Sequence, residues 1–424
     1  MNERKTMLLR SRVVLPLSRP PIEDGAVLIS GNRIGAVGRW AELSRTYTGQ
    51  TVDLGESALL PGLVNAHCHL DYTGLAGQFP APKNFTDWLK LITTGKSGLT
   101  YSDYAESWLE GARMLLRTGT TTVGDVEMAP ELLPDVWTAT PLRVISFLEM
   151  TGVKSRREPT EILRETLEKI ESLPVGRCHA GLSPHAPYST TPELLRLASQ
   201  AARRKNLRVA THVAESAQEF EMFAHARGEM HEWLSRNRRD MSDCGLGSPV
   251  RHLERCGALD ENLLAVHVNY LGPGDAPLLG KRKVHVAHCP RSHAYFRHQP
   301  FPIGELSADG INICLGTDSL ASVTKPRKGA LELSLLEEMR EFSSKARGLP
   351  PETVLRMVTV NGARALGLEG KIGELCAGAF ADMIAVPHAG KPAEGFQSVV
   401  QHRGQVTASL IDGQWAVAPA EVNA

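Results

Sequence analysis

The chain has 424 residues, enough for two or three domains or for one large α/β barrel with an appendage. Lys plus Arg and Asp plus Glu each number 47, and this zero net charge argues against binding to nucleic acid or acidic membranes. The seven cysteines form no CxxC pair, and no apolar run approaches the roughly 20 residues of a membrane span. Since the N-terminus also lacks a signal-peptide pattern, we expect a cytoplasmic protein without a disulfide framework.

Residues 1–57 have the pattern of short strands separated by turns. The segment AVLISGNRIGAVG carries Gly-Asn at its centre, which is typical of a β-hairpin. The same pattern of short strands and turns recurs in residues 369–424, where QVTASLIDGQWAVA centres on Asp-Gly. We therefore expect both ends of the chain to form one small composite β-sandwich domain.

Residues 58–368 alternate strands with helices. The first strand is expected over Leu60–His69, and the eighth, in INICLGTDS, ends near Asp318. Alternating βα units over about 310 residues fit a (β/α)8 TIM-like barrel, which needs about 250. The strands between them are predicted in TTTVGDV, RVISFLEM, AGLSPHAPYS, LRVATHVAES, LLAVHVNYL and KVHVAHCP.

The segments between these strands show helix signals. Residues 101–119 place apolar side chains on one helical face and end at Gly119. Thr160 is expected to cap a helix over residues 159–172, and Thr191 a helix that has Pro192 in its first turn. The polar residues 236–255 are expected to form an elaborated loop between the fifth and sixth strands.

Ionisable side chains occur at the carboxyl ends of the predicted strands, although barrel strands are buried and mainly apolar. These ends all meet at one mouth of the barrel, where active sites lie. We therefore expect residues distant in sequence to converge there, with His288 bracing its strand rather than binding a ligand. The converging set is His67, His69, Glu149, His185, His212, Glu215, His267, His288 and Asp318.

The HCH sequence at the end of the first strand indicates a metal site. His67 and His69 point the same way because side chains on a strand repeat every second residue. A mononuclear site needs about four ligands and an open position for water. We assign His67, His69, His212 and Asp318 as ligands of one divalent ion. Nitrogen and carboxylate donors suit Zn²⁺, with Fe²⁺ and Mn²⁺ as alternatives.

Three of the converging residues are assigned to catalysis. Glu215 follows His212 by three residues and is placed to pass a proton to the substrate. Asp318 is placed to accept a proton from a water that the metal ion activates. His267 is assigned to polarising the group under attack or to steadying that water.

These motifs resemble those of the amidohydrolase superfamily, in the family's order and over nearly the whole chain. The most similar branch holds the cytosine, guanine and S-adenosylhomocysteine/methylthioadenosine deaminases, with their chlorohydrolase relatives. The resemblance implies a metal-dependent barrel with a composite β-sandwich, in a homo-oligomer such as a dimer or tetramer, and it implies the ligand and catalytic roles given above. The fourth strand lacks the lysine of binuclear branches, which favours a single metal ion. The matching segments are PGLVNAHCHL, SPHAPYS, THVAES, VHVNYL, AHCPRS, LGTDS, VNGARALGL and KIGELCAGAFADMIAV.

The resemblance also implies a substrate contact for His185, and we assign Trp88, Asp87 and Glu149 to the same pocket. Three positions depart from the pattern of relatives. Asp87 in FTDWL stands where adenosine-type deaminases have a Glu that holds the ribose, and Glu149 lies near a position where they often have Arg. His293 stands where relatives usually have Asn.

A basic segment after the eighth strand contains Lys325, Arg327 and Lys328, with Arg291 on the neighbouring loop. Loops at this place in barrels often bind anions. Two interpretations of this segment are open. It binds an anionic group of the substrate, or it forms a solvated loop or a subunit contact.

The leading hypothesis is a metal-dependent hydrolytic deaminase that acts on a small molecule: an amino-substituted purine, pyrimidine or related heterocycle, or its nucleoside. A chlorohydrolase-like or cyclic-amide hydrolase with the same mononuclear site is the alternative. A non-catalytic assembly or binding protein is a remote third, because such relatives lack the metal ligands that this sequence retains.

Overall fold

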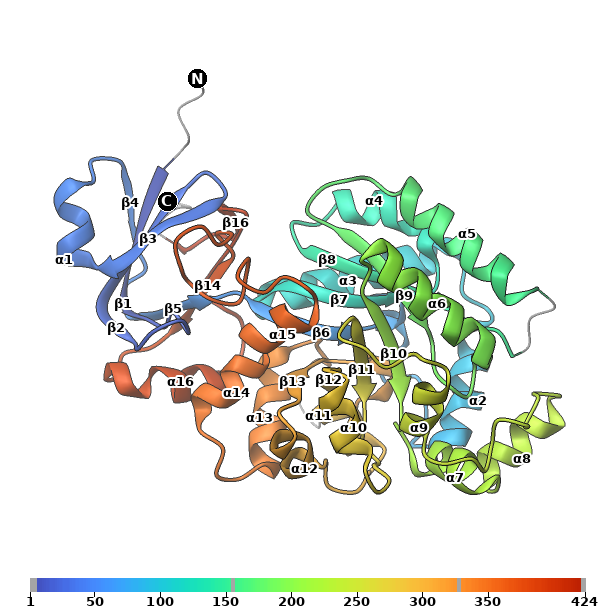
Figure 1. Cartoon of the computed structure of the whole chain (residues 1–424). Helices are drawn as coiled ribbons and strands as arrows, with labels where there is room; N and C mark the ends of the chain where they lie inside the picture. The colour runs from blue at the N-terminus through green and yellow to red at the C-terminus, as the bar shows by residue number, and fades with distance from the viewer. Residues whose placement is uncertain (1–5, 154–156, 326–328, 421–424) are drawn as a thin grey trace.

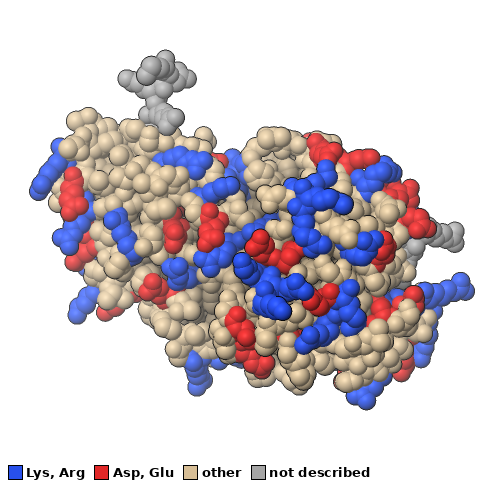
Figure 2. Space-filling model, viewed as in Figure 1, with Lys and Arg blue, Asp and Glu red and all other residues tan. Residues whose placement is uncertain are grey.

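Two eight-stranded β-sheets organise the chain, one built from its two ends and one from its middle (Figure 1). The structure is a computed structural model, and it describes residues 6–153, 157–325 and 329–420. Lys and Arg side chains alternate with Asp and Glu over the face shown in Figure 2, consistent with the zero net charge. Within the described residues, no helix is long and apolar enough to cross a membrane.

The terminal sheet joins both ends of the chain, as predicted. Its order is β16-β15-β14-β5-β1-β2-β3, with β4 paired to β1. The Gly-Asn hairpin connects β2 to β3, and the Asp-Gly turn connects β15 to β16. The strands are β1 Thr6–Val14, β2 Ile22–Ser30, β3 Arg33–Arg39, β4 Gln50–Asp53, β5 Ser57–Pro61, β14 Met383–Pro387, β15 Ala408–Ile411 and β16 Gln414–Val417.

The middle sheet confirms the predicted barrel of eight parallel strands. Its strands pair in sequence order from β6 to β13. A parallel bridge between Cys68 and Asp318 brings the last strand beside the first and closes the ring. The strands are β6 Leu63–Cys68, β7 Thr120–Glu127, β8 Arg143–Met150, β9 His179–Pro184, β10 Val209–Val213, β11 Leu263–His267, β12 His285–His288 and β13 Asn312–Leu315.

The single strand expected over Leu60–His69 is wrong, because the chain changes sheets at Gly62. Strand β5 ends at Pro61 in the terminal sheet, and β6 begins at Leu63 in the barrel. A Cβ atom at Gly62 would lie 2.1 Å from Thr121 Oγ1, so only glycine fits this crossing. The residues before the crossing therefore belong to the terminal sheet, and the expected division into 1–57, 58–368 and 369–424 stays a prediction.

Helices cover the outside of the barrel. Thr191 caps α6 as predicted, by accepting a bond from Leu194 N. The cap expected at Thr160 is wrong, because α5 begins at Pro159 with Glu158 as N-cap. Residues 236–255, expected as a loop, contain α9. The helices are α1 Trp40–Leu43, α2 Phe85–Lys96, α3 Tyr101–Arg117, α4 Leu133–Thr138, α5 Pro159–Ser172, α6 Pro192–Lys205, α7 Ala217–His225, α8 Glu229–Arg236, α9 Pro249–Arg255, α10 Asp275–Lys281, α11 Pro290–Tyr295, α12 Ile303–Ala308, α13 Leu335–Lys345, α14 Pro351–Met357, α15 Val360–Ala365 and α16 Gly395–Gln401.

A buried ionic cluster joins the two sheets. Arg143 at the start of β8 donates to Asp382 (Nε–Oδ2 3.0 Å) and to Asp412 (Nη2–Oδ1 2.8 Å). Both Arg143 and Asp382 are 3% exposed, so removal of either partner would leave an uncompensated buried charge. The terminal sheet is therefore fixed to the end of the barrel that lies opposite the mouth.

Candidate metal and substrate site

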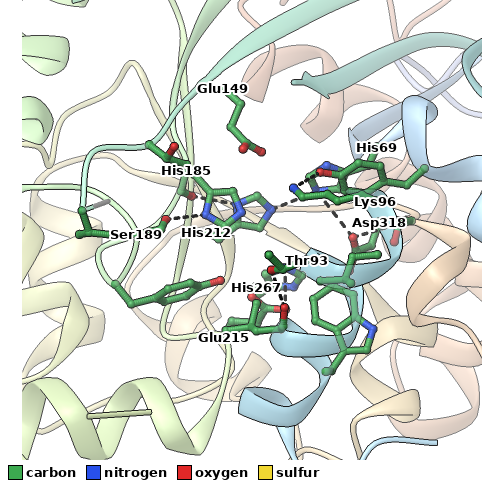
Figure 3. Close-up of a pocket in the computed structure, with 18 of the residues that line it drawn as sticks. His69, Thr93, Lys96, Glu149, His185, Ser189, His212, Glu215, His267 and Asp318 are labelled. Carbon is green, nitrogen blue, oxygen red and sulfur yellow. Dashed lines mark hydrogen bonds and ion pairs between the residues drawn. The ribbon is translucent and has the colours of Figure 1, made fainter. Parts of the chain in front are cut away.

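The carboxyl ends of three barrel strands bring the predicted metal ligands together (Figure 3). His67 lies on β6 and His69 directly follows it, while His212 lies on β10. Asp318 follows β13 and pairs with Cys68 between the two histidines of β6. All four side chains are buried. Strand register therefore places them around one point, although up to 251 residues separate them in sequence.

The donor atoms of this cluster face one another. The ring nitrogens offered by His67, His69 and His212 lie within 4.8 Å of one another, and the Nε2 atoms of His69 and His212 are 3.2 Å apart. Asp318 Oδ1 lies 3.9 Å from His67 Nε2 and 3.8 Å from His69 Nε2. Three nitrogens and one oxygen thus converge, which is the ligand number and chemistry of a mononuclear site.

Unpaired buried nitrogens show that the cluster fits a metal ion. Both ring nitrogens of His67 are buried without a hydrogen-bond partner, a costly arrangement unless a ligand satisfies them. His212 Nδ1 donates to the carbonyl oxygen of His185 (2.8 Å). That bond leaves the lone pair of His212 Nε2 facing the cluster, as in the outer shell of metal-binding histidines.

The protonation states also suit metal binding. Burial lowers the pKa of His212 to about 4, and it holds the pKa values of His67 and His69 well below their ordinary range. Burial alone would raise the pKa of Asp318, but the facing rings of His267 and His67 hold it below its usual value. Neutral imidazoles and an ionised carboxylate are the forms that bind a divalent cation.

A second cluster adjoins the first and shares Asp318. The donor atoms of Glu215, His267 and Asp318 lie within 4.8 Å of one another, and His267 Nε2 is 3.4 Å from Glu215 Oε1. Burial raises the pKa of Glu215 well above its ordinary value, and the charges of Asp318 and Glu219 act in the same direction. A carboxyl group whose pKa is raised in this way is suited to act as a general acid.

Two residues of this second cluster adopt backbone conformations that L-residues rarely take. His267 has φ 76° and Asp318 has φ 54°. Asp318 is held in place by Ser319 N (2.7 Å to Oδ1) and by the Ser322 hydroxyl (3.2 Å to Oδ2). Such conformations persist where the surroundings enforce them, and they are frequent at functional sites.

The clusters form the floor of a cavity of about 250 Å³. Predicted substrate residues Trp88, Glu149 and His185 line it, and His185 Nδ1 lies 2.7 Å from Ser189 Oγ. Asp87 is not among the lining residues, because its carboxylate faces Lys90 (3.1 Å), so its substrate role stays a prediction without a pocket contact. The lining residues that the sequence analysis missed include Tyr72, Lys96, Tyr188 and Trp233.

The interpretation of the basic segment as an anion site is not supported by the position of Arg291, whose guanidinium is bound to Glu338 (2.5 Å) and to Glu337. Lys325 does not line the cavity, and Arg327 and Lys328 lie outside the described residues.

His288 and His293, two histidines near this loop that the sequence pattern singled out, lie outside the pocket. The His288 ring stacks on Phe301 with centroids 3.9 Å apart and does not line the cavity, which agrees with the bracing role expected for it. His293 Nε2 donates to the carbonyl oxygen of Gln299 (2.8 Å).

Comparisons with known proteins agree with this architecture. The chain is 32% identical over 409 residues to 5-methylthioadenosine/S-adenosylhomocysteine deaminase of Syntrophobacter fumaroxidans, covering 91% of this chain and 85% of the relative. It is 29% identical over 360 residues to 5'-deoxyadenosine deaminase of Methanoregula boonei, covering 81% and 75%. Among solved structures, an adenosine deaminase from Xanthomonas campestris with bound Zn superposes with a TM-score of 0.84 at 25% identity, covering 99% of this chain and 94% of that one.

The match to a family model spans both the barrel and the second half of the terminal sheet. The amidohydrolase family model matches residues 58–416, a range that includes all the converging residues of the two clusters. With these clusters at the mouth of a closed parallel barrel, the chain belongs to the amidohydrolase family.

Proposed function

We propose that the protein is a metal-dependent hydrolytic deaminase of an amino-substituted purine or related heterocycle, carried as a nucleoside. The observation that carries the proposal is the placement of Glu215 and His267 beside the His67–His69–His212–Asp318 cluster. The deaminase activities named for the relatives of Syntrophobacter fumaroxidans and Methanoregula boonei support the reaction class.

We propose His67, His69, His212 and Asp318 as the holders of one divalent ion, with Zn²⁺ favoured over Fe²⁺ and Mn²⁺. The bound Zn of the Xanthomonas campestris structure supports this choice. When bound, such an ion acts as a Lewis acid and lowers the pKa of a water molecule to roughly 7. The cytoplasmic location and the homo-oligomeric state stay predictions from the sequence.

The reaction replaces an amino group by oxygen. A water oxygen forms a bond to the ring carbon that bears the amino group, the bond from this carbon to the amino nitrogen breaks, and ammonia leaves. Glu215, whose raised pKa favours the protonated form, donates its proton to the adjacent ring nitrogen. Asp318 accepts one proton from the attacking water and passes it to the departing amino group, and the second proton of that water returns to Glu215 as the C=O bond forms. His267, whose Nε2 lies 3.4 Å from Glu215 Oε1, orients the attacking water.

The walls of the cavity suit a flat ring. Trp88 and Trp233 on two helices and Tyr188 after β9 place aromatic side chains around the space above the clusters. Aromatic side chains bind flat rings by offset stacking and edge contacts. His185 is held by Ser189 and faces the same space, where it is positioned to contact the ring.

Ammonia release from a panel of aminated purines, pyrimidines, triazines and their nucleosides tests the proposal. The protein is first loaded with Zn²⁺, and its metal content is measured. Release of ammonia from at least one nucleoside in the panel is expected, with one oxygen gained by the product. Release of chloride from a chlorinated triazine, without ammonia from any member, would instead select the chlorohydrolase alternative.

A further inference from the structure

Two opposite charges lie in the wall of the cavity, away from the metal ligands and the proton-transfer residues. Lys96 is the last residue of α2, and Glu149 lies near the end of β8. Both line the same cavity, and Figure 3 shows the Glu149 carboxylate pointing into it between His185 and His69. Among the described residues, the side chain of Glu149 makes no hydrogen bond or ion pair, and no carboxylate lies within 4.0 Å of Lys96 Nζ. Within the described part of the chain, neither group therefore forms an ion pair within 4.0 Å.

The Lys96 ammonium is nevertheless held in a fixed position. Its Nζ donates to the Tyr72 hydroxyl (2.7 Å), approaches Met128 Sδ (3.4 Å) and lies 5.2 Å from the centre of the Tyr72 ring. An ammonium group has three N–H donors. One is used by the phenol and one is weakly used by the thioether, so the third is available to a ligand. A donor that is already positioned binds with a smaller loss of conformational entropy.

The spacing along α2 directs Lys96 toward the cavity. Trp88, Ile92 and Lys96 follow one another at four-residue intervals, which places them on one face of the helix. All three line the cavity. An apolar stripe that suits a flat ring therefore ends in a cation, and the Glu149 carboxylate lies on the facing strand end. The ring of a substrate and its substituent would then contact different parts of one wall.

We propose, on the basis of the deaminase function above, that Lys96 and Glu149 form a specificity-determining pair that binds the substituent carried by the heterocycle. This substituent presents a hydrogen-bond acceptor to Lys96 and a neighbouring donor to Glu149. A vicinal diol of a sugar and an α-amino acid group both have this chemistry. A bare heterocycle would displace water from both charges without replacing its hydrogen bonds, which is unfavourable.

The test compares substrates with the same reacting ring. Adenosine and 2′,3′-dideoxyadenosine differ in the diol, and S-adenosylhomocysteine and 5′-methylthioadenosine differ in the α-amino acid group. In at least one pair, the wild-type kcat/KM is expected to favour the member with the group by roughly tenfold or more, because a polar pocket rejects analogues that leave it unpaired. The substrate pair that shows the preference identifies which group, the vicinal diol or the α-amino acid group, Lys96 and Glu149 bind.

Two variants assign that preference to the proposed residues. Lys96→Met and Glu149→Gln are each expected to reduce the preference to within roughly threefold, mainly because kcat/KM falls for the member that carries the group. Lys90→Met is the matched control, since Lys90 lies on the same helix, pairs with Asp87 and does not line the cavity. A wild-type enzyme without a preference in either pair, or variants that lower both members of a pair equally, would overturn the proposal.

The failure of this proposal is distinguishable from failure of the deaminase function. If no substrate releases ammonia, the deaminase function is wrong, and calorimetric dissociation constants for the same pairs then test the binding pair alone. Tighter binding of the diol or amino acid member to the wild type than to Lys96→Met supports the proposal. Equal affinities, or no binding by any member, would overturn it.

Discussion

The inner and outer ends of the cavity are built from different kinds of elements. At the inner end, the metal ligands and proton-transfer residues come from the ends of β6, β10, β11 and β13, whose register is fixed by parallel pairing. At the outer end, Trp88 and Lys96 come from α2 and Trp233 comes from α8. The difference indicates a division of roles, with the reaction set by strand register and much of the contact with the substrate set by the packing of helices.

The two outer helices contact each other independently of the metal ligands. The Asn84 amide, which caps α2, donates to Glu229 at the start of α8. Lys90 Nζ lies 6.0 Å from the centre of the Trp233 ring. Changes at the outer end are therefore expected to alter substrate binding while leaving metal content intact, and changes at the inner end to abolish turnover. The following predictions test this separation.

The largest effect is expected from His69→Ala at the inner end. The substitution removes a nitrogen that lies 3.2 Å from His212 Nε2 and 3.8 Å from Asp318 Oδ1. We expect loss of stoichiometric metal and a fall in kcat of about a thousandfold or more. Metal analysis and ammonia release measure these effects. His225→Ala, at an exposed position of α7, is the control. Full metal content in the His69→Ala protein would contradict the ligand assignment.

Glu215→Gln should separate proton transfer from metal binding. The amide has nearly the same shape as the carboxyl group but cannot donate and recover a proton. We expect kcat to fall by roughly 10²- to 10⁴-fold, with metal content equal to that of the wild type. Glu221→Gln on the outer side of α7 serves as control, because Glu221 pairs with Arg227 near the surface. Wild-type turnover by Glu215→Gln would remove Glu215 from the proposed mechanism.

The inner end was accessible from the sequence because strand geometry is simple. Side chains repeat every second residue, and the ends of parallel barrel strands share one mouth. These two rules placed His67, His69, His212 and Asp318 together without knowledge of any loop. What they did not show was where the first strand begins, since the change of sheet at Gly62 depends on a close contact with Thr121 from a distant part of the chain.

The outer end was less accessible because a helix changes the direction of its side chains by about 100° per residue. Asp87 and Trp88 are neighbours in sequence, yet Trp88 lines the cavity and Asp87 pairs with Lys90. The rotation of α2 about its axis is set by packing against the barrel, which the sequence alone does not state. Once that rotation is known, the four-residue spacing from Trp88 identifies Lys96.

Trp88→Ala tests the outer end with a smaller expected effect. Trp88 packs against Phe85 and Phe296, at ring-centroid distances of 5.7 and 5.3 Å, and presents a face to the cavity. Loss of one aromatic contact with a substrate ring corresponds to roughly a tenfold rise in KM. We expect kcat to change by less than about threefold and metal content to be retained. A collapse of kcat at unchanged KM would contradict the separation of the two ends.

The last prediction concerns Glu219, whose carboxyl group accepts a hydrogen bond from the backbone of Glu215 at the inner end of the cavity. Glu219 is fully buried, and its Oε2 accepts a bond from Glu215 N (2.8 Å), while its Oε1 has no hydrogen-bond partner. Burial raises the pKa of Glu219 from 4.5 to about 8, and the backbone N–H groups of Glu215 and its neighbours only partly oppose this rise. The native protein therefore retains a proton that the unfolded chain releases.

The sign of the pH dependence follows from this proton. The stabilisation from Glu219 is fully present below pH 4.5, the ordinary pKa, and it is lost as the pH rises toward about 8, the native pKa. Glu219→Gln removes the titration and keeps the shape. Between pH 5 and 8 (approximate limits), the free energy of unfolding of the wild type should fall relative to the variant by about 3–4 kcal/mol. Denaturant unfolding of both proteins at several pH values measures this difference. Parallel stability curves would show that Glu219 is ionised in the native state, and the support of Glu215 would then come from a charged carboxylate rather than a neutral one.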